Sequence, residues 1–288
     1  MFGLTFSPPF FLFHPGKRLK MIESQISELE LEKDLSGVDS KYIVLHVYKA
    51  LQVLTMLAER GKLTLKEVYM DLSISKAQAF RYLQTLCASG FAEYDEETGL
   101  YHLGIRSWEL GQSSTRYAKL LELALPYMED LRDRFNETVN LGTVSGSNII
   151  YLGMVESGHS LRMHATIGSS DPVYTTSLGK AMLAFYPEET WTTYVPEKLA
   201  PRTHRTITTR EALWQELRTT KERGYSLDEG ENEIGACCVG APLFDRQGRV
   251  VAAVSLSAPS SRLQGTFILE AAKAVMSTAE AISQRIRS

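Results

Sequence analysis

The chain has 288 residues and a formal net charge of −3, and its hydrophobic share of 44% and charged share of 23% are those of an ordinary globular protein. This length is sufficient for two domains that each bury a core, and no apolar run approaches the ~20 residues that a membrane-spanning helix requires. The three cysteines, two of them adjacent at Cys237 and Cys238, form neither a disulfide framework nor a metal-ligand spacing, which favours a reduced cytoplasmic setting. No metal or cofactor is expected.

Residues 1–40 look like an extension in front of the first predicted domain. The apolar run at residues 10–13 is too short for a signal peptide, and the basic residues Lys17 and Arg18 follow it instead of preceding it. Two interpretations remain open: the true start lies near Met21, or residues 1–40 form a genuine and partly disordered arm.

Two helices are predicted between residues 45 and 72. In the first, apolar residues recur at helical spacing, and the helix ends at Gly61. These residues are Leu45, Tyr48, Leu51, Leu54 and Leu57. The second helix is shorter and begins with the capping-box pair Thr64 and Glu67. Its apolar positions are Val68, Met70 and Leu72.

A third helix is predicted from Ser75, which has the capping-box spacing to Gln78. Its core-facing residues are Ala79, Leu83, Leu86 and Cys87. The other face offers two cations, an amide and two hydroxyls, which are groups that contact phosphates and base edges. These residues are Lys76, Gln78, Arg81, Tyr82 and Thr85. A solvated helix face has the same composition, so the assignment to DNA depends on the neighbouring elements.

A β-hairpin is predicted directly after the third helix. Residues 90–94 alternate in polarity, residues 95–99 form a turn, and residues 101–103 alternate again. Three helices followed by a hairpin indicate a winged helix-turn-helix, in which the last helix enters the major groove of DNA. Residues 41–90 carry a net charge of +4 in an acidic chain, which is typical of a DNA-binding segment. The acidic hairpin tip at residues 95–97 should avoid phosphates.

This half of the chain resembles the N-terminal domain of IclR-type bacterial transcriptional regulators. The resemblance is carried by Lys49-Ala50-Leu51, Leu63-Thr64-Leu65, Arg81-Tyr82-Leu83-Gln84-Thr85-Leu86, Gly90-Phe91 and Tyr101-His102-Leu103-Gly104. The family usually has Ser-Thr where Ala77-Gln78 stand and Arg where Lys49 stands. The resemblance implies DNA binding, with Ala77 among the DNA-contacting positions.

The second half mixes strands and helices without a strict βαβ alternation, which indicates an α+β domain. Residues 104–118 are expected to form a linker helix that contains Trp108, and an amphipathic helix follows at residues 120–135. Strands are predicted at residues 138–144, 149–155, 161–166, 237–244 and 250–257. Helices are expected near residues 178 and 188, from a cap at Thr208 and Glu211 to Gly224, and at residues 267–285.

The second half also resembles the IclR effector-binding domain, which implies a GAF-like antiparallel sheet flanked by helices. The matching segments are residues 137–141, 177–181, 224–225, 231–235 and 252–262. The expected domain organisation is an extension at residues 1–40, a winged helix-turn-helix at 41–103, a linker helix at 104–118 and an effector-binding domain at 119–288.

The strand at residues 250–257 indicates a pocket. Val250, Ala252, Val254 and Leu256 share one face, and Ser255 and Ser257 share the other. By themselves the two serines could simply point to solvent. The resemblance implies that Ser255, Ser257, Cys238 and Asp228 contact an effector. It also implies that the backbone N–H groups of Ser177 and Leu178 bind the carboxylate of that effector, at a helix start that favours anions.

Other patterns support weaker interpretations. Ser177 and Lys180 have the S-x-x-K spacing of penicillin-binding enzymes, but the partner motifs are missing. Asp228, Glu229, Glu231 and Glu233 could bind a cation, although an exposed acidic loop is commoner. Arg162 and His164 could face an anionic ligand or solvent. No G-x-S-x-G, HExxH or Walker motif is present, so the chain is not expected to be an enzyme.

Together these patterns predict a regulator, repressor or activator, that is controlled by a small organic acid. The expected partners are a pseudo-palindromic double-stranded DNA operator, a small carboxylate effector and a second copy of the chain, with the linker helix as the dimer contact. The resemblance adds the option of a homotetramer; no membrane partner is expected. The alternative is an enzyme or small-molecule sensor that carries an accessory helix-turn-helix.

Overall fold

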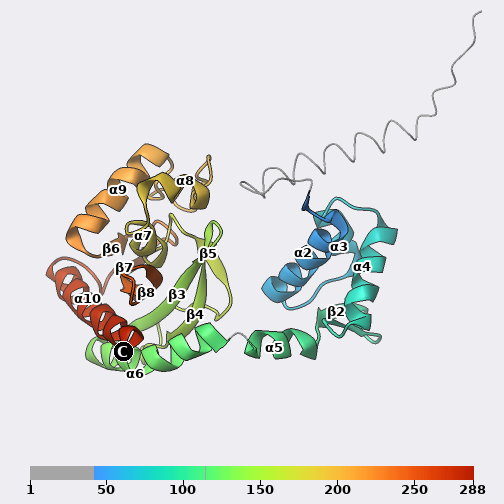
Figure 1. Cartoon of the computed structure of the whole chain (residues 1–288), viewed down its shortest axis with the longest axis horizontal. Coiled ribbons are helices and arrows are strands. Elements are labelled where there is room, and N and C mark those ends of the chain that lie inside the picture. Colours follow the sequence, from blue (N-terminus) through green and yellow to red (C-terminus); the bar gives the residue numbers. More distant parts are fainter. Residues whose placement is uncertain (1–41, 114) are drawn as a thin grey trace, which may run out of the picture. The chain divides into compact units, whose positions relative to one another are not determined.

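The computed structural model describes residues 42–113 and 115–288, which divide into two compact units (Figure 1). One unit ends at Trp108 and the other begins at Glu109, inside the segment predicted as a linker helix. The interpretations of residues 1–40 concern a segment outside the described residues. None of the helices in the described ranges has the length and apolar character that crossing a membrane requires.

The first unit has the element order predicted for a winged helix-turn-helix. The helices are α2 (Leu45–Arg60), α3 (Leu65–Asp71) and α4 (Lys76–Ala88), and the antiparallel strands are β1 (Ala92–Asp95) and β2 (Leu100–Leu103). Both predicted capping boxes are present, Thr64 with Glu67 and Ser75 with Gln78. Each box satisfies backbone N–H groups that the first helical turn leaves without partners.

The core of this unit differs from the predicted apolar stripe at two positions. Val53, Met56 and Leu57 are buried on α2, whereas Leu51 is 55% exposed. Leu51 lies two residues from Val53, about 200° around the helix, and therefore faces away from the core. The same spacing from the buried Val68 leaves Met70 of α3 60% exposed. The apolar pattern predicted the two helices correctly, but it did not predict which side of each helix packs against the core.

The wing is attached to the helices through its second strand. Leu63 and Tyr101 exchange backbone hydrogen bonds of 3.0 and 2.8 Å. The buried Tyr101 ring packs against Tyr94 with centroids 4.7 Å apart. At the tip, the Asp95 carboxylate accepts from the backbone N–H groups of Glu97 and Thr98, so this acidic side chain stabilises the turn.

The second unit contains a six-stranded antiparallel sheet in the order β5-β4-β3-β8-β7-β6. The strands are β3 (Thr138–Ser145), β4 (Asn148–Val155), β5 (Ser170–Pro172), β6 (Ser226–Asp228), β7 (Ala236–Phe244) and β8 (Val250–Pro259). The helical elements are α5 (Ile105–Gln112), which spans the division between the units, α6 (Thr115–Phe135), α7 (Ser177–Leu183), η2 (Glu188–Thr190), α8 (Trp191–Tyr194), α9 (Arg210–Arg223) and α10 (Thr266–Arg287).

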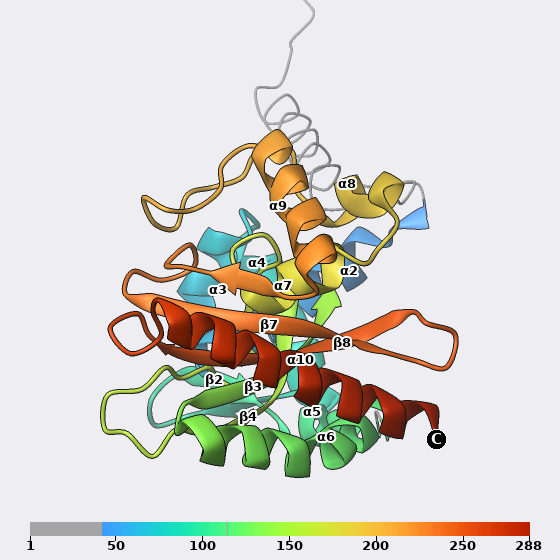
Figure 2. The same cartoon turned by 90° about the vertical axis from the view of Figure 1, so that its left-hand side faces the viewer.

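Helices cover both faces of this sheet (Figure 2). α6 and α10 pack on one face, where Ala252, Val254 and Leu256 of β8 enter the core. α7, α8 and α9 lie over the opposite face. Because strand residues alternate between faces, Ser255 and Ser257 point away from the side of Ala252, Val254 and Leu256, as predicted, and the side they face is that of α7. Both serines are buried, so the interpretation that they simply face solvent is wrong.

A glycine allows α7 to lie close to the sheet. A Cβ atom at Gly240 of β7 would lie 2.8 Å from the backbone of Ser177. Any larger residue would force the start of α7 away from β7.

Three predictions for the chain after the hairpin are wrong. Residues 161–166 are irregular, and their carbonyl groups accept hydrogen bonds from side chains instead of a neighbouring strand: Thr138 donates to Met163 O at 2.6 Å and Arg262 to Leu161 O at 2.9 Å. The cap of α9 is Thr209 and not Thr208, because the Thr209 hydroxyl accepts from the Ala212 N–H. α6 begins at Thr115, so residues 104–118 are not one helix.

Candidate DNA-binding face and ligand cavity

The exposed face of α4 carries most of the residues predicted to contact DNA. Lys76, Ala77, Arg81 and Thr85 are exposed. Gln78 is half-buried, and its Oε1 accepts from the backbone N–H of Ser75 at 3.1 Å and from the Ser75 hydroxyl at 2.9 Å. Only the amide N–H groups of Gln78 are therefore free for a base.

Tyr82 is the exception, because its side chain lies in the core. It is 9% exposed, its hydroxyl is 2.7 Å from Nδ1 of His46, and burial raises its pKa. Tyr82 follows the buried Ala79 by three residues, which places both on one side of the helix. Phe80 and Gln84 are exposed instead and were missed. Their spacing of four and eight residues from Lys76 could have identified them.

The cations of this unit are not all available to DNA. Lys49 is buried and its Nζ donates to Leu72 O at 3.5 Å. Arg60 lies 2.6 Å from Asp71 in an ion pair. The exposed cations within residues 42–90 outside that pair are Lys62, Lys66, Lys76 and Arg81. The basic character predicted from residues 41–90 is therefore carried by fewer side chains than the sequence count suggested.

A cavity of about 260 Å³ lies in the second unit, between the sheet, α7 and the segment at residues 163–171. All six predicted effector-contacting residues line it: Ser177, Leu178, Asp228, Cys238, Ser255 and Ser257. The sequence placed them in four separate segments, and the fold brings them together around one space.

The floor of the cavity follows the register of four strands. Asp228 of β6 is directly opposite Cys238 of β7, and Cys238 is directly opposite Ser257 of β8. Ser255 is directly opposite Asn140 of β3. Directly paired residues point to the same face of a sheet, so these five side chains form one continuous polar surface.

The titratable groups on this floor are held in their neutral forms more strongly than usual. Burial raises the pKa of Asp228, although the Lys180 cation and the backbone N–H groups of residues 230–232 oppose this shift. Burial raises the pKa of the Cys238 thiol well above its ordinary value, and the nearby Asp228 adds to the effect. Cys238 is therefore a neutral thiol and a weak hydrogen-bonding group, not a reactive thiolate.

Several cavity residues were not identified from the sequence. Tyr151 donates its hydroxyl proton to Asp171 Oδ2 at 3.1 Å, and Arg202 lies 3.2 Å from Asp171 Oδ1. Burial, followed by the charge of Asp171, raises the pKa of Tyr151. Asn140 also lines the cavity. The sequence does contain a pattern that could have identified Asn140 and Tyr151: each is a polar side chain within a predicted strand whose other residues are mostly apolar.

The start of α7 borders the cavity. Thr176 caps this helix by accepting from the Gly179 N–H at 3.0 Å. Among the hydrogen bonds of the described residues, the backbone N–H groups of Ser177 and Leu178 have no protein acceptor. These two groups are consequently available to a ligand oxygen.

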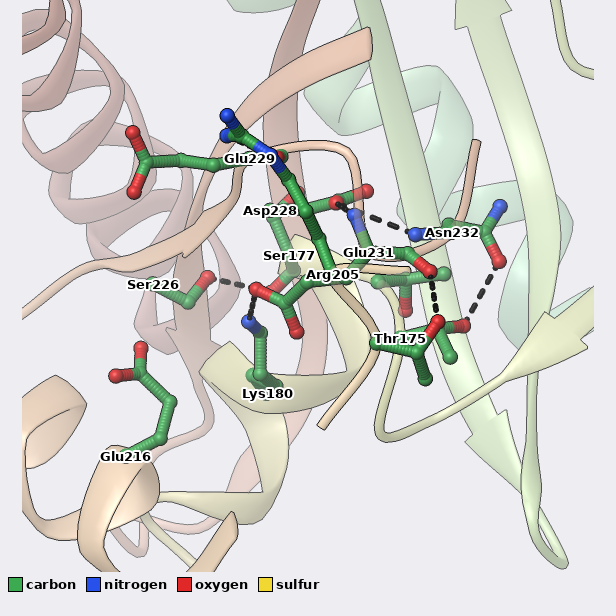
Figure 3. Close-up of polar contacts among 12 residues, drawn as sticks. Thr175, Ser177, Lys180, Arg205, Glu216, Ser226, Asp228, Glu229, Glu231 and Asn232 are labelled. Carbon is green, nitrogen blue, oxygen red and sulfur yellow. Dashed lines mark hydrogen bonds and ion pairs between the residues drawn. The ribbon is translucent and has the colours of Figure 1, made fainter. Parts of the chain in front are cut away.

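A buried ion pair joins α7 to the turn after β6 (Figure 3). Lys180 of α7 is fully buried and donates to Glu231 Oε1. The backbone N–H of Glu231 donates in turn to Asp228 Oδ1 at 2.7 Å, which connects the ion pair to the cavity floor. Lys180 is therefore engaged as a structural cation, which argues against the S-x-x-K nucleophile.

The other open alternatives also have structural answers. The acidic cluster that could have bound a cation has a different role at Asp228, whose Oδ1 accepts hydrogen bonds from the backbone N–H groups of Glu231 and Asn232 and stabilises a turn. Among residues 42–113 and 115–288, no three acidic, His or Cys side chains are grouped so that they could hold a metal ion. Arg162 and His164 lie on an irregular segment, not a strand, and both pair with Glu156, at 2.8 and 3.3 Å. Only His164 lines the cavity.

Two protein-family models match the chain. Residues 112–284 match the bacterial transcriptional regulator IclR C-terminal model, and residues 47–96 match the IclR helix-turn-helix domain. The chain is 30% identical to the HTH-type transcriptional regulator KdgR of Escherichia coli K12, over 91% of this chain and 97% of that protein. It is 31% identical to the regulator BhcR of Paracoccus denitrificans, over 82% of this chain and 85% of that protein.

Solved structures have the same fold. The Thermotoga maritima IclR structure superposes with a TM-score of 0.63 at 31% identity, covering 84% of this chain and 98% of that one. An IclR homolog from Microbacterium hydrocarbonoxydans, solved in complex with 4-hydroxybenzoate, superposes with a TM-score of 0.72 at 23% identity, covering 84% and 98%. At that identity the second likeness supports the fold alone.

Proposed function

The chain belongs to the IclR family of bacterial transcriptional regulators, and we propose that it binds an operator through α4 and responds to a small carboxylate held in the cavity of the second unit. The observation that carries this proposal is the convergence of six predicted effector-contacting residues, from four separate segments, on one cavity. A chain that both recognises DNA and holds such a cavity has the two sites that ligand-controlled regulation requires.

The DNA contacts are assigned to the exposed face of α4. Arg81 and Lys76 contact phosphate or base edges, and the amide N–H groups of Gln78 and the hydroxyl of Thr85 are the candidate base readers. Ala77 lies in the same first turn and offers only a methyl group. Tyr82 is left out of this set because its side chain is buried.

A gel-shift titration at several salt concentrations tests this assignment. Arg81→Ala should weaken operator binding and lower the slope of log affinity against log salt by about one, because one phosphate contact is lost. Arg218→Ala, which removes a surface cation paired with Glu188 in the second unit, is the matched control and should leave both quantities unchanged. Unchanged affinity in Arg81→Ala would show that α4 does not read the operator.

The effector is assigned to the cavity. A carboxylate would accept hydrogen bonds from the free backbone N–H groups of Ser177 and Leu178 and from the hydroxyl of Ser255 or Ser257. The raised pKa of Asp228 favours a protonated carboxyl beside such an anion, which reduces charge repulsion. Ligand binding controls DNA binding to the extent that it favours one arrangement of the DNA-binding domains over another.

A thermal-shift screen of small carboxylates tests the cavity. An acid that stabilises the wild type should stabilise a Ser255→Ala, Ser257→Ala double variant much less, because both cavity hydroxyls are lost. A Ser260→Ala, Ser261→Ala variant removes two exposed hydroxyls just after β8 and should respond like the wild type. If no acid stabilises the wild type, or if the cavity variant responds equally, the cavity is not the sensor.

We further propose a homodimer, with assembly into a homotetramer as a second level. One recognition helix reads too few base pairs for a unique address, so a pseudo-palindromic operator with half-sites about one helical turn apart is expected. α5 exposes three large apolar side chains, Ile105, Trp108 and Leu110, which are suited to burial against a second copy. A monomer in sedimentation at micromolar concentration with operator present would refute this assignment.

The enzymatic alternative makes a different prediction. A regulator acting on the chromosome works in the cytoplasm and releases its ligand unchanged, whereas an enzyme converts it. Incubating the protein with a stabilising acid and analysing the acid by mass spectrometry separates the two. Recovery of the acid without conversion supports the regulator, and a product formed only by the wild type and not by the Ser255→Ala, Ser257→Ala variant supports the enzyme.

A further inference from the structure

One hydrogen-bond acceptor at the cavity floor has no partner. Asn140 of β3 is 4% exposed and lines the cavity, and among the described residues its Oδ1 accepts no hydrogen bond. A buried amide oxygen without a donor is costly, and buried polar groups in folded proteins are normally satisfied. The position of this atom indicates that a bound molecule supplies the missing proton.

The hydrogen bond that Asn140 makes to a neighbouring side chain shows which atom of its amide has no partner. Asn140 Nδ2 donates to the Ser257 hydroxyl oxygen at 3.1 Å, so the nitrogen end of the amide has a partner. Oδ1 is therefore the unpaired atom.

A second group at the cavity can only accept. Tyr151 gives its only hydroxyl proton to Asp171, which leaves its oxygen able only to accept. A ligand that satisfies both Asn140 Oδ1 and the Tyr151 oxygen must bring hydrogen-bond donors. Neither a keto group nor an unsubstituted aromatic ring has any.

The size and chemistry of the lining narrow the ligand further. A volume of about 260 Å³ lies just below the range of about 300–1,000 Å³ that is usual for small-molecule sites, which indicates a small ligand. The lining is mainly polar, and its apolar surface comes from the Tyr151 ring and from Met163, Ala165, Leu178 and Ala236. A short chain with an oxygen on most carbons fits both the volume and the polarity.

We propose that the effector is a hydroxylated aliphatic acid, of the aldonic type, in which one hydroxyl donates to Asn140 Oδ1. This inference rests on the proposed function, because it assumes that the cavity is the effector site. Asn140 is then a specificity-determining residue: it selects a hydroxyl over a methylene or a carbonyl at one position of the chain. A site built around a buried acceptor rejects an analogue that lacks the donor, because the acceptor is left unpaired.

Isothermal titration calorimetry with matched acids tests the proposal. The probes are erythronate and ribonate, their unhydroxylated counterparts butanoate and pentanoate, and 2-oxobutanoate and benzoate. We expect at least one aldonate to bind the wild type at least about tenfold more tightly than the other four acids. Asn140→Leu, which keeps the side-chain size and removes the acceptor, should lose at least about tenfold in aldonate affinity and little in butanoate affinity.

A control on the same strand separates specificity from stability. Thr143 of β3 is buried, donates to Val251 O at 3.0 Å and lies outside the cavity lining, so Thr143→Val should keep the wild-type ligand preference. Tighter binding of butanoate, 2-oxobutanoate or benzoate than of the aldonates would overturn the inference and leave the proposed function standing. Binding of none of the acids would overturn both. If Asn140→Leu fails to fold, the wild-type comparison of erythronate with butanoate still decides.

Discussion

Replacing Lys180 by Met should destabilise the second unit by about 3–5 kcal/mol at pH 8. The Lys180 side chain is fully buried, and the Glu231 side chain to which it donates is 12% exposed. Glu231 Oε2 already has no partner among the described residues. Met preserves the length and the apolar stem of Lys, so the substitution mainly removes a charge. It leaves a buried carboxylate without its cation, which is the costly way to break a buried ion pair.

The unfolding free energy that Lys180→Met loses should be larger at high pH than at low pH. Burial raises the pKa of Glu231 to about 7, with the Lys180 cation acting against the shift. A carboxyl whose pKa rises on folding binds its proton more tightly in the folded state, so its contribution to stability falls as pH increases from the unfolded value of 4.5 through about 7. Without Lys180 this pKa rises further. At pH 5.5 Glu231 is largely protonated in both proteins. The difference in unfolding free energy should therefore be smaller than at pH 8 by up to about 1.4 kcal/mol, because pH 8 lies one unit above the wild-type pKa of about 7.

Urea unfolding followed by tryptophan fluorescence measures this difference. Trp191 and Trp214 pack together in the second unit, with ring centroids 5.2 Å apart, so their emission reports on the unit that contains the ion pair. The control is Lys180→Met combined with Glu231→Leu, which should regain most of the lost stability because both charges are removed together. A single variant that loses less than about 1 kcal/mol at pH 8, or a double variant no more stable than the single one, would refute the reasoning.

Three further predictions follow from the structure. Tyr82→Phe should lower the unfolding free energy of the first unit by about 0.5–1.5 kcal/mol, because the hydrogen bond between the Tyr82 hydroxyl and His46 is lost. Operator affinity in a gel shift should stay unchanged. A loss of affinity without a loss of stability would mean that Tyr82 faces DNA. Gly240→Ala should cost about 1–3 kcal/mol in denaturant unfolding, since its Cβ would meet the Ser177 backbone; wild-type stability would show that α7 can move away freely. Cys238 should resist alkylation by iodoacetamide at pH 8 in the folded protein, because burial raises the pKa of its thiol, and it should react once urea unfolds the protein. Peptide mass spectrometry measures the alkylated fraction. Rapid alkylation of the native protein would contradict this prediction.

Local features of the sequence determined the elements of the first unit. The two capping boxes join residues three positions apart, and each was predicted and found at the same pair of side chains. The apolar period of the helices and the alternation of the hairpin strands are equally local. Such patterns depend on bonds within one turn or one strand, so the rest of the fold does not alter them.

The direction in which each element faces required the tertiary structure. Tyr82 and Leu51 both lie on correctly predicted helices, yet Tyr82 is buried and Leu51 is exposed. A helix with apolar residues on more than one side can dock in several orientations, and packing against the other elements selects one of them.

The hydrogen-bond partners around the cavity could be identified only from the tertiary structure. The sequence and its resemblance identified the side chains of Ser255, Ser257 and Cys238, but not their partner Asn140, which is 117 residues from Ser257 along the chain. Lys180 and Glu231 are likewise 51 residues apart. Cross-strand register places Asn140 within hydrogen-bonding distance of Ser257, and register is set by the pairing of whole strands and not by any property of the single residues. Lys180 reaches Glu231 because α7, which carries it, packs against the sheet next to β6 and β7.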